Sequence, residues 1–214
     1  MDPDRVRTVV LADALPPAFE AACLVRCTEV AGLPGRRRPQ QALATPPVVA
    51  PRGVLAEFDQ PAAAARLTAL LTGLGFPARH DVHSGGNRWS YDVQRVLLPE
   101  SRRAAATAMM ATAWRQGRQS LLDATPLGGS SPRHTQRLAL AYTAWRAVLL
   151  AGGRRRRTDR VRVHLGNHDL ATVLVRAARL LEVRAEVISR PGCLMVAVPA
   201  ADAAVLEAPE LISA

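Results

Sequence analysis

Hydrophobic residues recur along the chain with two different periods, and the periods separate helices from strands. Between residues 61 and 74, four leucines fall at i, i+3, i+4 and i+7: Leu67, Leu70, Leu71 and Leu74. That spacing predicts an amphipathic helix. Residues 142–153 are instead apolar nearly throughout, with Arg146 as their only charge and a glycine pair at their end. A helix with so little polar surface is buried on more than one side, so we expect it at the centre of the fold. Gly152 or Gly153 can supply its left-handed C-terminal cap.

Strict alternation predicts strands at two places. Residues 160–165 place one apolar set on one face: Val161, Val163 and Leu165. The other face carries Arg160, Arg162 and His164. Residues 88–97 also alternate, and we assign the buried face to Trp89, Tyr91 and Val93. The solvent face then carries Arg88, Ser90, Asp92 and Gln94. A period of two is typical of half-buried antiparallel strands.

The remaining segments complete a mixed helix and strand pattern. Residues 1–15 are expected to form a loosely docked lead-in. The central helix is predicted to run from about residue 135 to residue 152. Further helices are predicted at residues 16–32, 99–117, 168–181 and 200–206, and further strands at 53–58, 76–82, 183–189 and 193–198. Glycine, serine and proline crowd together around residues 120–133, which favours a linker. We therefore divide the chain into a first half at 1–118, a linker at 119–133 and a second half at 134–214.

The two halves repeat each other. A shift of 107 positions places Val54 on Val161 and Phe58 on Leu165, and the apolar positions agree over most of thirty residues. An apolar helix that ends in glycine precedes each repeated block, at Gly32 and at Gly152-Gly153. A duplicated unit of helix, strand, helix, hairpin and helix predicts a pseudo-two-fold α+β fold.

Charge indicates the kind of partner. The net charge is +10, and all 28 basic residues are arginine. A surface this basic attracts polyanions, of which nucleic acid is the commonest in a cytosol. No signal peptide or membrane span is predicted, so we expect a cytoplasmic, nucleoid-associated protein without a membrane partner. The chain has three cysteines, Cys23, Cys27 and Cys193. A small and odd number of cysteines argues against a disulfide framework.

Three segments carry a resemblance to a known family. The segments are LVRCTEVAG at 24–32, WRAVLLAGG at 145–153, and residues 65–96 with their SGG turn before an arginine and an aromatic residue. Their order resembles the LAGLIDADG homing-endonuclease fold, and more closely its catalytically silent version in the WhiA family of actinobacterial sporulation regulators. The resemblance covers roughly residues 19–206. It implies two similar halves, an antiparallel sheet saddle that tracks a duplex, and helices packed on one face. WhiA proteins also carry a C-terminal helix-turn-helix domain, for which a chain ending at Ala214 leaves no room.

The resemblance also bears on nuclease chemistry. Active members place an acidic residue just before the last glycine of each motif helix, and the two carboxylates hold divalent metal. The matching positions here are Ala31 and Gly152, neither of which can ligate a metal. Glu29 lies two residues earlier and has no acidic counterpart at Leu150. We therefore expect no catalytic residues, no metal, no cofactor and no enzyme activity.

A zinc site is the alternative that the cysteines leave open. Cys23 and Cys27 are spaced i, i+4, while His80 and His83 are spaced i, i+3, so the four side chains offer a Cys₂His₂ set. The two cysteines also fit the buried stripe of one helix. We favour core thiols and surface histidines over a metal site.

The basic groups carry the functional hypothesis, which is contact with double-stranded DNA. The candidate residues are Arg88, Ser90 and Gln94 on one strand, Arg160, Arg162 and His164 on another, and the loop cluster Arg154, Arg155, Arg156 and Arg157. These side chains suit phosphates and base edges. A second cluster at residues 36–38 is expected to be solvated. We expect a non-catalytic DNA-binding regulator or accessory protein, in transcription or sporulation control. The alternatives are a protein-interaction module that partners a transcription regulator, and an RNA-binding protein.

Overall fold

The computed structural model describes residues 3–28, 53–85, 91–123, 131–152, 155–157, 159–190 and 193–207 of the 214-residue chain. The helices are α1 Pro3–Thr28, α2 Pro61–Gly73, α3 Glu100–Leu122, α4 Pro132–Ala151, α5 His168–Leu180 and α6 Ala200–Glu207. The strands are β1 Val54–Phe58, β2 Arg79–Gly85, β3 Tyr91–Leu97, β4 Arg155–Arg157, β5 Arg160–Leu165, β6 Glu186–Arg190 and β7 Cys193–Pro199. None of these helices is long and apolar enough to cross a membrane.

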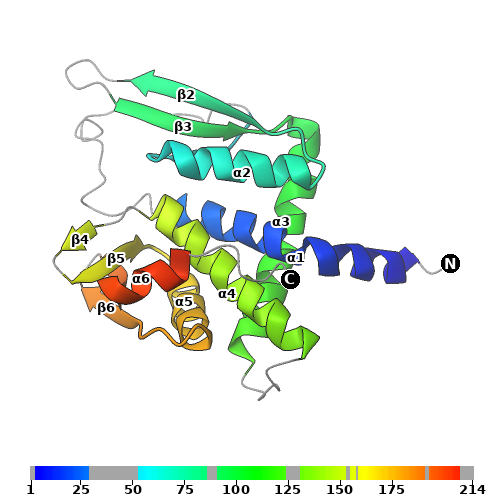
Figure 1. Cartoon of the computed structure of the whole chain (residues 1–214). Coiled ribbons are helices and arrows are strands. Elements are labelled where there is room, and N and C mark those ends of the chain that lie inside the picture. The colour runs from blue at the N-terminus through cyan, green and yellow to red at the C-terminus, as the bar shows by residue number, and fades with distance from the viewer. Residues whose placement is uncertain are drawn as a thin grey trace.

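The two halves share one plan of strand, helix, hairpin and helix (Figure 1). In the first sheet β3 lies between β1 and β2, and in the second sheet β7 lies between β5 and β6. All of these pairings are antiparallel, and β4 adds a fourth strand beyond β5. The predicted α+β fold with two similar halves is confirmed. We call the side of each sheet that packs on the helices its inner face, and the opposite side its outer face.

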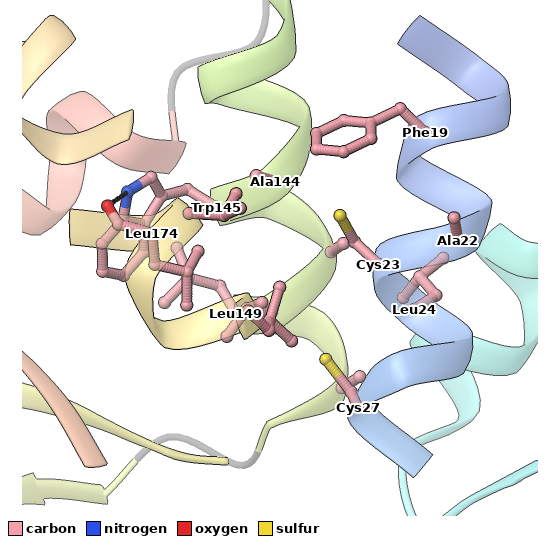
Figure 2. Packing of buried hydrophobic residues seen from close by; sticks show 14 of the residues in the cluster. Phe19, Ala22, Cys23, Leu24, Cys27, Ala144, Trp145, Leu149 and Leu174 are labelled. Atoms are coloured by element: carbon pink, nitrogen blue, oxygen red, sulfur yellow. Dashed lines mark hydrogen bonds between the residues drawn. The ribbon is translucent and has the colours of Figure 1, made fainter. Parts of the chain in front are cut away.

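Helices α1 and α4 lie side by side between the two sheets, as the sequence predicts for the two motif helices (Figures 1 and 2). Small residues such as Ala22 and Ala144 are fully buried there and let the two backbones approach. On the other side of α4, Trp145 is completely buried, and its indole Nε1 donates to the backbone carbonyl of Leu174, 3.2 Å away. A buried indole needs such an acceptor, so Trp145 fixes α4 against α5.

Helix α3 packs closely against α1 at a glycine. A Cβ added to Gly117 would lie 2.3 Å from the ring of Phe19, so the two helices can approach only because residue 117 has no side chain. Phe19 stacks on Trp114 with ring centroids 5.8 Å apart, and the Arg26 guanidinium lies 4.2 Å from the Trp114 ring. Gly117 is therefore a packing residue inside α3, which continues to Leu122 rather than ending at residue 117 as predicted.

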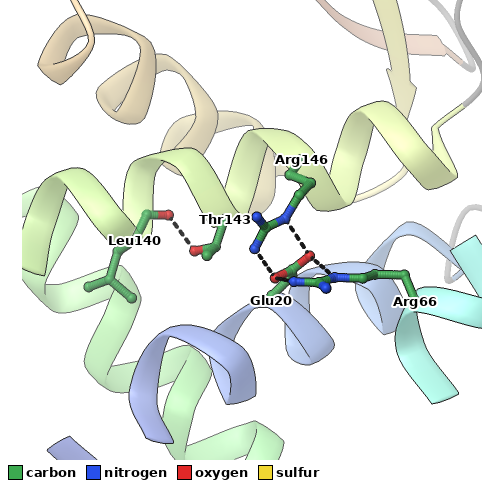
Figure 3. A network of polar contacts seen from close by, with 5 residues as sticks. All are labelled: Glu20, Arg66, Leu140, Thr143 and Arg146. Carbon is green, nitrogen blue, oxygen red and sulfur yellow. Dashed lines mark hydrogen bonds and ion pairs between the residues drawn. The ribbon is translucent and has the colours of Figure 1, made fainter. Parts of the chain in front are cut away.

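A buried carboxylate joins three helices across the two halves (Figure 3). Glu20 on α1 has no exposed side-chain surface and accepts two hydrogen bonds from Arg66 on α2, both 2.8 Å long. It also accepts two from Arg146 on α4, one of them 2.8 Å long. Burial acts to raise the pKa of the Glu20 carboxyl, but the hydrogen bonds and charges of Arg66 and Arg146 outweigh it and hold the pKa below its ordinary value. All four hydrogen bonds join a guanidinium donor to the carboxylate and are therefore charge-assisted, which makes this pairing strong.

The N-terminal helix differs from the sequence prediction. It begins at Pro3, and Pro16 and Pro17 lie inside it, whereas the prediction placed a loose lead-in at residues 1–15 and a helix start at residue 16. A proline inside a helix lacks an N–H donor and crowds the preceding turn, which is why the sequence favours a start there. The buried stretch from Ala18 to Cys27 packs on both α3 and α4 and offsets that cost. The predicted end at Gly32 lies outside the described residues.

The region between the halves also differs. Residues 120–122 belong to α3, and α4 begins at Pro132, where the Ser131 side chain accepts a hydrogen bond from the backbone N–H of His134 at 3.2 Å. Serine as N-cap followed by proline is a strong helix start, and it places the start earlier than the apolar pattern alone. The division of the chain at 118 and 134 stays a prediction.

We predict that Glu20→Gln lowers the free energy of unfolding by about 3 kcal/mol at neutral pH, the low end for breaking a buried ion pair, because both arginines keep some contact with water. Chemical denaturation followed by circular dichroism measures this.

Because the folded-state pKa of Glu20 is lowered, its contribution to the free energy of unfolding is present above the pKa that Glu20 has in the unfolded chain. That contribution is lost as the pH falls through the folded-state pKa. The variant should lack that part of the acid dependence. Glu100→Gln is the control, since Glu100 is 77% exposed in a weak 3.8 Å pair with Arg103, and it should change stability little.

Candidate nucleic-acid interface

Strand β5 turns its cationic residues to the outer face of the second sheet. Val161, Val163 and Leu165 are at most 1% exposed and form part of the core, whereas Arg160, Arg162 and His164 are partly exposed on the opposite side. The alternation predicted for residues 160–165 is therefore confirmed. Whether these side chains contact DNA remains a prediction.

Arg160 forms an ion pair on this outer face. Its guanidinium donates to the carboxylate of Glu186 on β6, across the central strand β7. The register places Glu186 opposite Ala197 of β7 and Arg160 opposite Pro199 of the same strand, so the pair spans β7 diagonally. The hydrogen bond that Arg160 donates to Glu186 raises the pKa of Arg160.

Arg162 stands in a different environment from Arg160. It is the central arginine of β5, half-buried, and its Nε is buried with no hydrogen-bond partner among the described residues. A buried guanidinium N–H without an acceptor is costly. Arg162 therefore differs from Arg160, whose guanidinium is paired with Glu186.

The arginine run after α4 contains a strand. Arg155, Arg156 and Arg157 form β4, whose backbone pairs antiparallel with Arg162, Val161 and Arg160. The sequence prediction of a loop is wrong for these three residues, because the free edge of β5 supplies backbone hydrogen-bond partners that the run of charges conceals. The registers bring Arg155 opposite Arg162 and Arg157 opposite Arg160. Arg154 lies outside the described residues.

The face assigned to the hairpin strand in the first half is wrong. Gln94 is only 6% exposed, and its side-chain oxygen lies 2.8 Å from Nε2 of His80. Val96 and Leu98 share its face and are almost fully buried, so this is the inner face. The signal that sequence reasoning missed is this later pair, which fixes the phase better than the aromatic residues at the strand's start. Gln94 therefore cannot contact a duplex on the outer face, and Arg88 and Ser90 lie outside the described residues.

The outer face of the first sheet carries charges of both signs. Arg95 on β3 lies directly opposite Glu57 on β1 and Asp81 on β2, and its Nε donates to Glu57 at 2.9 Å. Arg79 lies opposite Leu97 on the same face. Sequence reasoning did not single out these side chains, although the corrected phase of β3 identifies them.

The end of α4 packs tightly against β5. Gly152 closes the helix by donating its N–H to the carbonyl of Val148 at 2.7 Å, with φ −78° and ψ −1°. The predicted left-handed cap is therefore wrong at Gly152, and Gly153 lies outside the described residues. A Cβ added to Gly152 would lie 2.3 Å from Cγ1 of Val163 and 2.7 Å from the Val148 carbonyl oxygen. Glycine is needed here because β5 approaches closely, and Glu29 and Ala31 lie outside the described residues.

The structure does not bring the four residues of the zinc alternative together. Cys23 and Cys27 are buried between α1 and α4 (Figure 2), where burial raises the pKa of the Cys23 thiol well above its usual range. His80 and His83 lie three residues apart on β2, and alternation turns them to opposite faces of the sheet. Within the described residues there is no group of three or more side chains that could hold a metal ion.

Comparison with solved structures shows the fold. The chain is similar to the N-terminal LAGLIDADG domain of DUF199/WhiA, with a TM-score of 0.53 at 13% identity, over 92% of this chain and 84% of that one. It is equally similar to I-DmoI, solved in complex with DNA and manganese, with a TM-score of 0.53 at 12% identity, over 91% of this chain and 99% of that one. Full-length DUF199/WhiA from Thermatoga maritima matches with a TM-score of 0.46 at 14% identity, and the matched region spans 45% of its length. No protein-family profile and no curated protein matches the sequence. The two saddle-forming halves are thus a LAGLIDADG-like fold.

We predict that Gly152→Ala destabilises the protein by about 2 kcal/mol, because the added Cβ overpacks the contact between α4 and β5. The double change Gly152→Ala with Val163→Ala should recover part of that loss, since it removes the clashing methyl group. Thermal or urea unfolding of the three proteins measures the coupling. Gly73→Ala is the control, because a Cβ at Gly73 meets nothing within 4 Å and alanine favours the helix. Equal stability of Gly152→Ala and the unchanged protein would contradict the packing argument.

Proposed function

We propose that this chain is a non-catalytic DNA-binding regulatory or accessory protein of the WhiA type. The observation that carries the proposal is the cationic outer face of β5 and the three-arginine strand β4 paired to it, on a LAGLIDADG-like sheet. Guanidinium groups match phosphate oxygens with a fixed fork of donors, and phosphate contacts supply most of the affinity for a duplex. A protein of the same fold, I-DmoI, has been crystallised with DNA.

The proposed role is in transcription or sporulation control rather than in strand cleavage. Cleavage by this fold requires two carboxylates at the ends of the motif helices, and the resemblance assigns those positions to Ala31 and Gly152. The crowding around Gly152 supports this, because a carboxylate there would have to displace a buried valine. No catalytic residue and no metal are part of the proposal.

A protein partner is the second candidate, and one observation favours it. Glu57 and Asp81 flank Arg95 on the outer face of the first sheet, and Glu186 binds Arg160 on the second. A surface with paired charges of both signs suits a protein interface as well as a duplex. The salt dependence of binding separates the two, since counterion release is specific to a polyanion.

We predict that the chain binds duplex DNA with a steep salt dependence. Three or four phosphate contacts give a loss of about two orders of magnitude in affinity between roughly 50 and 200 mM salt. Fluorescence anisotropy with a labelled duplex, and with an RNA duplex of the same sequence, measures this.

The double change Arg160→Ala with Arg162→Ala should weaken binding and reduce the salt slope by about 0.9 per lost contact. Arg176→Ala with Arg179→Ala is the matched control, since it removes the same charge from exposed positions of α5. Undiminished binding by the first double variant would sink the assignment of this surface, and preference for RNA would favour the RNA alternative.

We predict no DNA cleavage in the presence of magnesium or manganese. Supercoiled and linear DNA incubated with the purified protein should stay intact by gel electrophoresis, because neither proposed ligand position offers a carboxylate. Metal-dependent cutting that disappears in Glu29→Gln would overturn the non-catalytic proposal. Cutting that persists in that variant would indicate a contaminating nuclease.

A further inference from the structure

The described charges on the outer face of the first sheet do not favour binding of phosphate. Arg95 lies between two carboxylates, Glu57 on one neighbouring strand and Asp81 on the other, in direct cross-strand register. Arg79 is the further cation of this face among the described residues. Two arginines against two carboxylates leave the described face without net charge, and the carboxylates flank its central arginine.

The outer face of the second sheet has the opposite balance. Arg160 and Arg162 point outward from β5, and β4 beside it consists of arginine alone. Glu186 is the carboxylate that the structure brings to this face, through its pair with Arg160. Arg155 and Arg157 stand opposite Arg162 and Arg160 in the register, whereas Arg156 stands opposite the buried Val161. Among the described residues, β4 and β5 therefore place four arginines at outer-face positions, near the carboxylates of Glu186 and Asp159.

The distance over which charges act keeps this difference local. In about 0.1 M salt the screening length is roughly 10 Å, so a phosphate responds mainly to the charges of the sheet beneath it. The two sheets are separated by the central helices α1 and α4 (Figure 1). A phosphate over the first sheet thus meets Glu57 and Asp81 nearby, whereas one over the second sheet meets Arg162, which forms no ion pair with a described residue.

We propose that the chain holds a duplex asymmetrically, with its phosphate contacts supplied by the outer face of β5 in the second half and with Glu186 limiting their strength. Arg162 is the principal contact, because no ion pair with a described residue holds its guanidinium, whereas Glu186 holds that of Arg160. Arg160 becomes available to phosphate only when its pair with Glu186 opens. This inference rests on the proposed DNA binding and deepens it, since it assigns the contacts to one half.

The experiment compares single variants of the full chain in duplex binding across a salt series. Arg162→Ala removes one proposed contact and should weaken binding roughly eightfold near 0.1 M salt, with a slope smaller by about 0.9. Arg79→Ala removes the same charge from the outer face of the first sheet and should leave both the affinity and the slope unchanged. Arg176→Ala on α5 removes it from the helical side and corrects for net charge. Glu186→Gln releases Arg160 and should tighten binding severalfold, with a steeper salt slope, a gain that misfolding cannot produce.

Each outcome has a distinct meaning. A wild-type chain that does not bind the duplex refutes the proposed function and this inference with it. A chain that binds, but weakens equally in Arg79→Ala and Arg162→Ala, keeps the proposed function and refutes the asymmetry. If Glu186→Gln binds no more tightly than wild type, the proposed limit set by Glu186 is wrong. Circular dichroism melts of each variant confirm that a loss of binding is not a loss of fold.

Discussion

The pairing of one buried carboxylate with two arginines is the constraint on which the arrangement of the two halves depends. Glu20 belongs to α1, Arg66 to α2 and Arg146 to α4, so a single side chain fixes the first half against the central helix of the second. A carboxylate without exposed surface is unfavourable unless its charge is compensated, so a packing of α1 on α4 that separated these groups would be penalised. Apolar packing of small residues can tolerate a sliding of one helix along the other, whereas bidentate pairs from two directions cannot. The ion pairs thus specify the alignment that the alanines permit.

The contrast between the two sheets explains how a nearly symmetric fold can present two unlike surfaces. Both sheets obey the same alternation, and each turns its inner face to helices, the first sheet to α1 and α2 and the second to α5 and α6. The outer faces are free of that requirement. On the first sheet, opposite charges lie side by side on neighbouring strands and compensate each other. On the second sheet, most of the charged residues are arginines. Duplicated architecture therefore constrains only half of each strand's residues, and the difference in charge resides in the other half.

Local patterns predicted the elements well, and long-range partners account for what they missed. The alternation of residues 160–165 was sufficient because both faces are uniform along the strand. In β3 the apolar residues change face along the strand, so the phase chosen from Val93 and its aromatic neighbours conflicted with the buried Val96, and Gln94 was misplaced. Strand β4 exists because of the edge beside it rather than because of its own composition. Glu20 and Arg146 are 126 positions apart, and no periodicity connects them. A lone acid in one apolar helix and a lone arginine in another are nevertheless a signal, since each needs a partner.

The close approach of β5 to Gly152 has a consequence for how the sequence can change. Every single substitution at residue 152 adds a Cβ that meets Val163 and the end of α4, whatever chemistry the new side chain would bring. Any side chain at this position therefore has to displace Val163 and the Val148 carbonyl. The tight packing at the end of α4 thus limits which residues can replace Gly152. The positions that can change one substitution at a time are those on the outer faces, where a side chain can be replaced without disturbing the helices beneath the sheet.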